Sequence, residues 1–240
     1  MSMINEDFSS YSKIRDIGRW YITGFVQAVA RKLPPGVLIL DAGAGECVYK
    51  KFFTHCTYKA IDLAVGESRW NYGNLDYIGP LHDMPIDDAS FDAILCTQVL
   101  EHLEHPHESV KEMHRVLKPG GALYLTAPMA HPEHQAPYDF FRFTSFGLRS
   151  ICSQAGFSDI TITPFGGMWV RWAYELPRGL SIFPMAGLRS GNPNPAGIAL
   201  IPVRLFMLVL IRLLQRIFLW CDGFDRSKSD PFGWSCVAVK

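Results

Sequence analysis

The stretch VLILDAGAGE, residues 37–46, constrains the fold of this chain more than any other segment. Its apolar first part has the character of a buried strand, and it passes through Asp41 into a turn that holds Gly43 and Gly45. A strand that ends in a glycine-rich turn is typical of α/β sheets that bind a nucleotide-like ligand at the turn. The segment therefore predicts an α/β domain with a ligand site at the carboxyl end of this strand.

The rest of the chain alternates between strand and helix patterns. Short apolar runs predict strands near 37–41, 58–62, 91–97, 121–127 and 159–163, and in the final GWSCVAVK. Helical spacing predicts one or two helices between Tyr11 and Lys32, and further helices near 46–54, 107–117 and 145–155. Pro106 suits a first helical turn, and Pro119-Gly120-Gly121 is expected to end the same helix. This alternation predicts a mostly parallel sheet whose carboxyl edge binds the ligand.

Composition narrows the class of protein. The formal net charge is zero, with 23 Lys plus Arg against 23 Asp plus Glu, so nothing global draws the chain to nucleic acid. The six cysteines are widely spaced and form no C-x-x-C pair, which favours reduced thiols and argues against a zinc site built from cysteine. The N-terminal MSMINEDFSS lacks the basic and apolar parts of a signal peptide. These features predict a cytoplasmic protein.

Four segments are expected along the chain: an N-terminal helical segment at 1–35, a core domain at 36–170, an amphipathic helical insertion at 171–222 and the final core strand within 223–240. Inside the insertion there is no acidic residue between Glu175 and Asp222. A helical wheel of PVRLFMLVLIRLLQRIFLW puts Arg204, Arg212, Gln215 and Arg216 on one arc, opposite an apolar side. Its uncharged run is too short to span a membrane, so the helix can lie in a bilayer interface, pack in the core or form a dimer seam.

The charges at the glycine turn bear on the ligand. Val48 stands where the dinucleotide fingerprint has its third glycine, and both Asp41 and Glu46 are negative. A phosphate would meet two carboxylates here, whereas a ligand with an ammonium group is favoured by them. Asp62 ends the next predicted strand, 17 residues beyond Gly45, where an acid can accept both hydroxyls of a ribose. S-adenosylmethionine has an amino acid end, a sulfonium and a ribose, and no phosphate, so it fits this set.

The segments LDAGAGE, YKAIDL, LHDMPIDDASFDAILCTQVLEHL and EMHRVLKPGGALYLTAP resemble the class I S-adenosylmethionine-dependent methyltransferase family over most of residues 36–165. The resemblance implies a Rossmann-like, mostly parallel seven-stranded sheet with flanking helices. The short AVGESRWNYGNL leaves little room for a crossover helix, so the sheet is expected to be trimmed there. The cofactor-binding residues that the resemblance implies are Asp41, Gly43, Gly45, Asp62, Leu63, His82, Asp83, Met84 and Gln98. Pro80 departs from many relatives, which have an acid at its position for the adenine amine.

The acceptor is expected beyond the fifth strand, in APMAHPEHQAPYDFFRFT. Similar PYDFFRFT segments occur in a methyltransferase branch associated with the synthesis of glycans and cell-surface polymers. We expect His134 to be the general base, with Asp139 orienting it or taking its place. Arg142 suits an anionic group of the substrate, and Tyr138 and His102 are expected to line the same cleft. The competing interpretation is structural: Asp139 and Arg142 brace the loop, and Thr144 caps the next helix.

The histidines of EHLEHPHE raise the question of a metal site at His102, His105 and His107. Their spacing lacks the H-E-x-x-H pattern, and the family has an ordinary loop and helix start here, so the sequence predicts no metal.

The leading functional prediction is an S-adenosylmethionine-dependent methyltransferase that O-methylates a small or lipid-linked acceptor, such as a glycan or isoprenoid, at a membrane surface. Transfer to nitrogen or carbon is the less favoured variant. The alternative is a noncatalytic cofactor-binding or assembly module that uses the insertion as a protein interface, and a nicotinamide dehydrogenase ranks third. The expected partners are the acceptor, the cytoplasmic face of a membrane or a second copy through 176–221, and no nucleic acid.

Overall fold

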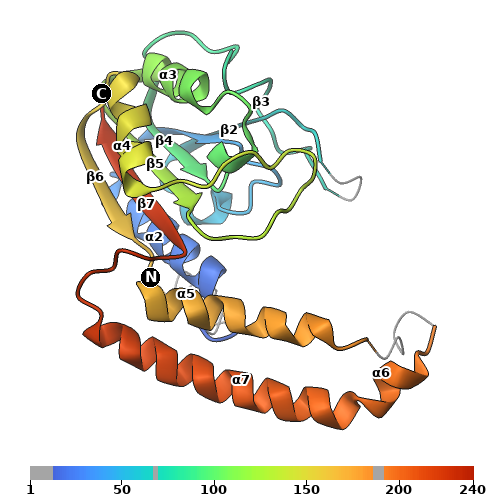
Figure 1. The fold of residues 1–240 in the computed structure, drawn as a ribbon. Helices are drawn as coiled ribbons and strands as arrows, with labels where there is room; N and C mark the ends of the chain where they lie inside the picture. Colours follow the sequence, from blue (N-terminus) through green and yellow to red (C-terminus); the bar gives the residue numbers. More distant parts are fainter. Residues whose placement is uncertain (1–12, 67–69, 186–191) are drawn as a thin grey trace.

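The computed structural model describes residues 13–66, 70–185 and 192–240 (Figure 1). Its strands are β1 (Leu38–Ala42), β2 (Thr57–Asp62), β3 (Tyr77–Ile78), β4 (Phe91–Thr97), β5 (Leu117–Pro128), β6 (Ser158–Pro164) and β7 (Gly233–Val239). The α-helices are α2 (Ile17–Lys32), α3 (Pro106–Val116), α4 (Ser145–Gln154), α5 (Met168–Glu175), α6 (Pro195–Ala199) and α7 (Ile201–Cys221). Short 3-10 helices are η1 (Lys50–Phe52), η2 (Leu100–His102), η3 (Leu176–Ile182) and η4 (Asp222–Phe224).

The strands form one seven-stranded sheet in the order β3-β2-β1-β4-β5-β7-β6. The five strands from β3 to β5 in this order run parallel to one another, and β7 runs antiparallel to both β5 and β6. This confirms the predicted fold, including the return of the last strand to the sheet. Chain order reverses between β1 and β4, and the carboxyl ends of strands at such a point form a crevice for a ligand.

Apolar side chains fill both faces of the sheet. One cluster packs beneath α3 and α4 and includes Met113 and Leu148, both at 0% exposure. The other lies beneath α2 and the segment after β1, and it includes Val26 and Phe53. The central strands are buried on both sides, which explains why their sequences are nearly continuous apolar runs rather than alternating ones.

The helix boundaries follow from local chemistry. Pro106 occupies the first turn of α3, where a missing N–H costs nothing. Thr144 caps α4, because its hydroxyl accepts a hydrogen bond from the N–H of Gly147 at 3.1 Å. The structural interpretation of Thr144 is therefore confirmed.

Two local predictions were wrong. No α-helix forms at 46–54; turns and η1 replace it, because Gly45 and Cys47 both have positive φ (51° and 57°), a conformation that an α-helix cannot include. Pro119-Gly120-Gly121 does not end α3, which stops at Val116; it lies in the irregular first part of β5, where the pairing with β4 jumps from Phe91 and Leu117 to Ala93 and Ala122. The described residues between β2 and β3 form no helix, and β3 is two residues long, as expected for a trimmed edge.

A pair of antiparallel helices, α5 and α7, extends from the sheet (Figure 1). Figure 1 shows it beyond the end toward which the arrowheads of β4, β5 and β6 point. A third apolar cluster, which includes Ile17, Phe165, Ala173 and Phe232, joins α2, α5 and the sheet at the base of this pair. The pair therefore stands at the same edge as the predicted site.

Three of the four residues of the polar arc of α7 contact neighbouring segments, whereas Arg216 is exposed. Arg204 donates to the carbonyl of Phe183 at 2.6 Å, Arg212 donates to the carbonyl of Ile14, and buried Gln215 donates to the carbonyl of Ala173 at 2.8 Å. These carbonyls lie in and around α5 and η3 and at the start of the described chain, and the arginine and glutamine donors satisfy them. Much of the rest of α7 is exposed and apolar, with members Val203, Leu205, Phe206, Leu208, Val209, Leu213, Ile217 and Trp220. We call these eight residues the apolar face of α7.

Candidate active site

The glycine turn after β1 is held tightly to β2. The N–H groups of Gly43 and Ala44 both donate to the carbonyl of Ile61, at 2.9 and 3.1 Å. Gly43 has φ of +80°, and a Cβ on it would come within 2.5 Å of the Val99 side chain. Glycine is thus required at 43 both by conformation and by the close approach of the chain after β4. Gly45 also has positive φ, but the space around it is open.

Asp62 links the turn to the end of β2. Its carboxylate accepts the N–H of Gly45 at 2.9 Å and the N–H of Ala64 at 2.9 Å. The carbonyl of Asp62 accepts the N–H of Gly79, which begins the loop after β3. Asp62 therefore fixes the relative positions of three connections at the carboxyl edge of the sheet, while its side chain stays partly exposed.

Asp41 differs from Asp62 in being buried, at 2% exposure. Burial raises the pKa of its carboxyl group to about 7, the hydrogen bond from the Tyr58 hydroxyl opposes this shift, and the charge of Asp62 adds to it. Asp41 is therefore an acid that changes charge near neutral pH. Glu46, the other acid of the turn, is exposed and accepts the N–H of Asn71 at 3.1 Å, which ties the β2–β3 connection to the turn.

Three residues other than glycine adopt positive φ in the segments that follow parallel strands. Cys47 (57°) follows β1, Ala64 (58°) follows β2 and Gln98 (54°) follows β4. Gln98 is held there by Thr126, whose carbonyl accepts its N–H at 3.0 Å and whose hydroxyl accepts its side-chain amide at 3.1 Å. Left-handed backbone at such residues costs free energy and collects at functional sites, so this edge of the sheet is the candidate active site.

The residues around the turn fit S-adenosylmethionine. The hydroxyl of Tyr72 is buried and has no hydrogen-bond partner among the described residues. Burial raises the pKa of Tyr72, and the charges of Asp62 and Glu46 raise it further. A bound polar group would satisfy it. Leu63, next to Asp62, is 53% exposed and offers an apolar surface of the kind that an adenosine covers.

The loop after β3 carries the residues expected to border the adenine. His82 and Asp83 are exposed, and the ring of His82 lies 5.6 Å from that of His105, at the start of α3. Met84 is buried in the core, its N–H donates to Glu112 at 3.1 Å and its carbonyl accepts from Arg115 at 3.1 Å. These contacts fix the backbone of Met84 in the loop, and its expected role beside the adenine stays a prediction.

A second group of polar side chains lies where the chain leaves β4 and β5. Glu101 and His102 belong to η2, and His134 comes from the loop at 129–144. The rings of His102 and His134 are 4.6 Å apart, and His131 stands 4.3 Å from His134. Burial lowers the pKa of all three histidines, and hydrogen bonds to the carbonyls of Tyr138 and Pro132 oppose this shift only in part, so these rings favour the neutral form that accepts protons.

Glu101 is the most enclosed member of this group, at 1% exposure. Burial raises the pKa of its carboxyl group to about 8, its own backbone N–H and the charge of Arg142 oppose the shift, and Asp139 adds to it. One carboxyl oxygen, Oε2, has no hydrogen-bond partner among the described residues. Sequence reasoning placed Glu101 after the fourth strand but assigned it no role.

Asp139 and Arg142 brace the 129–144 loop. The two carboxylate oxygens accept from the two terminal nitrogens of Arg142 at 2.7 and 2.8 Å, and one of them also accepts the N–H of His134 at 2.9 Å. Arg142 further donates to the carbonyls of His131, Phe141 and Pro132. These contacts use all five of its N–H donors.

These contacts change the interpretation of both Arg142 and Asp139. Arg142 has no donor left for an anionic group of a substrate. The guanidinium hydrogen bonds hold the pKa of Asp139 well below its usual range, so Asp139 cannot replace His134 as base and is left to orient it. The structural interpretation of this pair, which the sequence left open, is the one that the contacts support.

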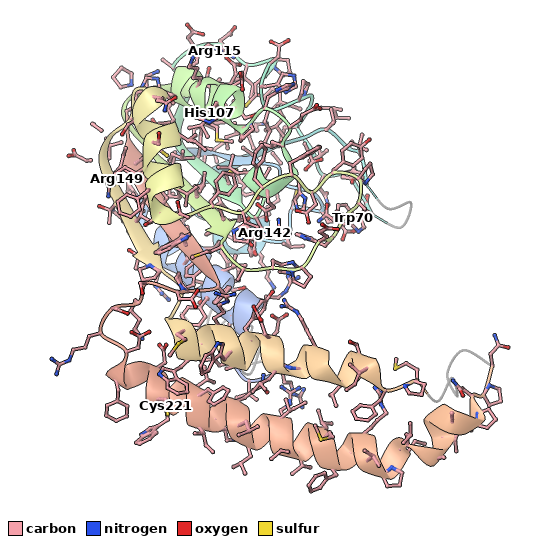
Figure 2. The ribbon with its side chains drawn as sticks, viewed as in Figure 1. Trp70, His107, Arg115, Arg142, Arg149 and Cys221 are labelled. Carbon is pink, nitrogen blue, oxygen red and sulfur yellow. The ribbon has the colours of Figure 1, made fainter. Side chains whose placement is uncertain are left out.

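The two parts of the site are continuous. Val99 packs against Gly43, and two residues later the carbonyl of Glu101 accepts the N–H groups of Phe140 and Phe141 at 2.8 and 3.2 Å. The carbonyl of Tyr138 accepts Nδ1–H of His102 at 2.6 Å, while the ring of Tyr138 is exposed. Residues 98–102 thus join the glycine turn to the histidines. His107 takes no part, since it lies on α3, away from Arg142 (Figure 2).

Sequence reasoning missed several residues of this site. Tyr58, Tyr72, Thr126 and Val99 have no motif of their own, and their roles depend on which strands are neighbours. The position of Glu101 could have been recognised from the sequence, because a charged residue shortly after a buried strand of a parallel sheet lies at the edge that binds ligands.

The order of the sheet and the glycine turn with its two acids define a Rossmann-like methyltransferase fold. A family model described as a methyltransferase domain matches residues 40–125. A probable S-adenosylmethionine-dependent methyltransferase of Mycolicibacterium smegmatis is 33% identical over 96 residues, which cover 38% of this chain and 37% of that protein. Over this central part the chain is similar to the methyltransferase domains of S-adenosylmethionine-dependent enzymes.

Two further similarities extend over more of the chain. A ubiquinone/menaquinone biosynthesis C-methyltransferase of Rubrivivax gelatinosus is 25% identical over 210 residues, 76% of this chain and 82% of that protein. The structure of 1,6-didemethyltoxoflavin-N1-methyltransferase from Burkholderia thailandensis has a TM-score of 0.53 and 15% identity, covering 99% of this chain and 87% of that one. With most of its first curated relatives, however, the chain shares only about half of their length or less.

Proposed function

We propose that the chain is an S-adenosylmethionine-dependent methyltransferase that methylates an oxygen of a small or lipid-linked acceptor at a membrane surface. The observation that carries the proposal is the continuous edge that runs from Gly43 and Asp62 through residues 98–102 to His134. A cofactor site and a proton acceptor then lie on one short path, which methyl transfer to a hydroxyl needs.

Different residues would bind the cofactor and accept the proton. Asp62 and the turn at Gly43 and Gly45 would hold the cofactor, which supplies an activated methyl group. His134 would accept the proton of the acceptor hydroxyl at Nε2. Its Nδ1 lies 3.2 Å from the carbonyl of Pro132 and 3.4 Å from a carboxylate oxygen of Asp139. Both groups only accept hydrogen bonds, so they favour the tautomer with the proton on Nδ1 and leave Nε2 free as the base.

The surroundings of the histidines favour an apolar acceptor. The ring of His131 lies 6.2 Å from that of Tyr174 on α5, so the α5–α7 pair borders the acceptor side of the site. The side chains of the apolar face of α7 are between 37% and 69% exposed, and Trp220 at its end packs against Phe224. Exposed apolar surface of this kind suits a bilayer interface, where an isoprenoid or glycolipid lies. The similarity to a quinone-biosynthesis methyltransferase supports an isoprenoid acceptor, although that relative is named for transfer to carbon.

None of the described helices has both the length and the apolarity to cross a bilayer. Contact with a membrane would therefore be made by the surface of α7 and not by insertion across it.

A second function is favoured by the same apolar face. A noncatalytic module could use it as a protein interface and keep the cofactor site for stability. This alternative predicts cofactor binding without methyl transfer.

The test is methyl transfer from radiolabelled S-adenosylmethionine to a lipid extract and, separately, to an aqueous extract of cells. We expect label in the lipid fraction with the unaltered chain, and a loss of at least 100-fold with His134→Gln. His107→Gln, on α3, is the matched control and should keep full activity. Label in neither fraction, from protein that binds the cofactor, would support the noncatalytic module instead.

A further inference from the structure

Glu101, His102 and His134 come together from two connections of the sheet. Each offers one ligand atom, and the three atoms lie within 4.8 Å of one another. Oε1 of Glu101 is 3.9 Å from Nε2 of His102. This cluster differs from the three histidines of EHLEHPHE that the sequence brought into question, because His105 stacks edge-on with His82 and His107 lies on the exposed surface of α3.

The buried carboxyl group of Glu101 lacks a partner for one of its oxygens. The side chain is 1% exposed, Oε2 has no hydrogen-bond partner among the described residues, and the nearby Arg142 spends all five donors elsewhere. A buried carboxylate is costly unless it is paired or bound to a cation. The orphaned oxygen belongs to a side chain that faces two imidazoles, which is a reason to expect a cation between them.

The two imidazoles are oriented like metal ligands. Nδ1 of His102 is bonded to the carbonyl of Tyr138 at 2.6 Å, and Nδ1 of His134 to that of Pro132 at 3.2 Å. A carbonyl accepts and cannot donate, so each ring carries its proton on Nδ1 and has a lone pair on Nε2. Metal-binding histidines show this arrangement, and the carboxylate of Asp139, 3.4 Å from Nδ1 of His134, completes a carboxylate–histidine pair.

We propose that Glu101, His102 and His134 bind a divalent transition-metal ion. Two imidazole nitrogens and one carboxylate oxygen are the ligands of open Zn²⁺ sites and suit other first-row divalent ions better than Mg²⁺ or Ca²⁺. Ligands of tetrahedral zinc are separated by about 3.3 Å, given bonds of about 2.0–2.1 Å. The cluster is wider than this, and His134, on a loop and partly exposed, can close it by rotation of its side chain.

The ion would take an acceptor oxygen in its open position, beside the cofactor half of the site. This role rests on the proposed function: a metal-bound hydroxyl loses its proton to solvent at a lower pH than a free one. His134 is then a ligand in the metal-bound protein, and the ion replaces it in activating the hydroxyl. Metal binding itself depends on no acceptor and is measured without one.

The experiment is calorimetric titration of chelator-treated protein with ZnCl₂, MnCl₂ and MgCl₂. We expect one Zn²⁺ per chain, bound more tightly than Mn²⁺, and no saturable binding of Mg²⁺ in the same range. Glu101→Gln, which keeps the shape of the side chain, and His134→Gln should each weaken Zn²⁺ binding at least tenfold. His107→Gln is the matched control and should bind as the unaltered chain does.

Two results would overturn the proposal: no saturable Zn²⁺ binding to the unaltered chain, or variants that bind Zn²⁺ as tightly as His107→Gln. Binding of S-adenosylmethionine by the same samples checks that each variant is folded, and His134→Gln decides alone if Glu101→Gln does not fold. Zinc binding without methyl transfer would refute the proposed function and leave the metal site standing. Methyl transfer without zinc binding would support the proposed function and refute the metal site.

Discussion

At the scale of single residues, the site depends on carboxylates placed in different surroundings. Asp62 is partly exposed and hydrogen-bonded by two backbone N–H groups, whereas Asp41 is buried between neighbouring strands and accepts a hydrogen bond from the Tyr58 hydroxyl. Burial raises the pKa of Asp41 to about 7, so the native protein binds a proton there more tightly than the unfolded chain, whose value is 3.8.

This difference predicts a pH dependence of stability. Because the folded pKa of Asp41 lies above the unfolded value, its contribution to stability is lost as the pH rises from about 4 to about 7. Asp41→Asn carries no charge and should abolish this loss. We expect the free energy of unfolding to fall by about 2–3 kcal/mol more between pH 5 and pH 8 in the unaltered chain than in Asp41→Asn.

Urea denaturation at the two pH values measures the effect, and Glu108→Gln, an exposed acid on α3, is the control. Identical pH dependence in Asp41→Asn and the unaltered chain would show that Asp41 is not held neutral by burial. The same substitution should weaken binding of S-adenosylmethionine at pH 8, since it removes a negative charge beside the ligand's ammonium group.

At the scale of elements, α7 is the least ordinary part of the fold. Side chains of its polar arc donate hydrogen bonds to carbonyls of neighbouring segments. Its apolar face is exposed to solvent, and Phe206 and Val209 are 67% and 69% exposed. Two of the arginines of the polar arc, Arg204 and Arg212, are occupied in these contacts. Membrane contact through α7 would therefore depend mainly on apolar burial and only weakly on lipid charge.

Vesicle flotation tests this account of α7. We expect the unaltered chain to float with vesicles of phosphatidylcholine nearly as well as with vesicles that contain phosphatidylglycerol. Phe206→Asp with Val209→Asp should abolish flotation, because two charges would enter the interface. Phe146→Asp, at an 82% exposed position on α4, is the control and should float normally. Flotation that survives the double substitution, or a dimer that the substitution dissociates, would favour the interface alternative.

Some helices and strands could be predicted from the sequence and others could not. Strands of the central sheet were found because burial on both faces makes them continuous apolar runs. The two residues of β3 are too few to produce a pattern, and the turn at 46–54 has helical spacing but a backbone with positive φ at Cys47. A helical wheel separates the two faces of α7, yet it cannot say which one the protein covers.

For the site, the sequence predicted the turn and Asp62 because glycine and an acid at that separation have a chemical reason to be there. It could not predict whether Arg142 binds a substrate or braces the loop. That role depends on carbonyls of the 129–144 loop, which come within hydrogen-bonding distance only in the folded chain. It could not pair Glu101 with His134 either, because they are far apart in sequence and meet only when two loops share one edge of the sheet.

At the scale of the whole molecule, a nucleotide-type sheet, a histidine-bearing loop and an apolar helical pair meet at one edge. The central claim is that the cofactor half of this edge binds S-adenosylmethionine through Asp62 and the glycine turn. A nicotinamide dinucleotide should be excluded, because its phosphates would face Asp41, Glu46 and Asp62 without a compensating cation at the turn.

The most direct test is calorimetric titration of the unaltered chain and of Asp62→Ala with S-adenosylmethionine and, separately, with NAD. We expect micromolar binding of S-adenosylmethionine, a loss of well over tenfold in Asp62→Ala, and no binding of NAD to either protein. Binding of NAD, or binding of S-adenosylmethionine that is unchanged in Asp62→Ala, would contradict this account of the glycine turn.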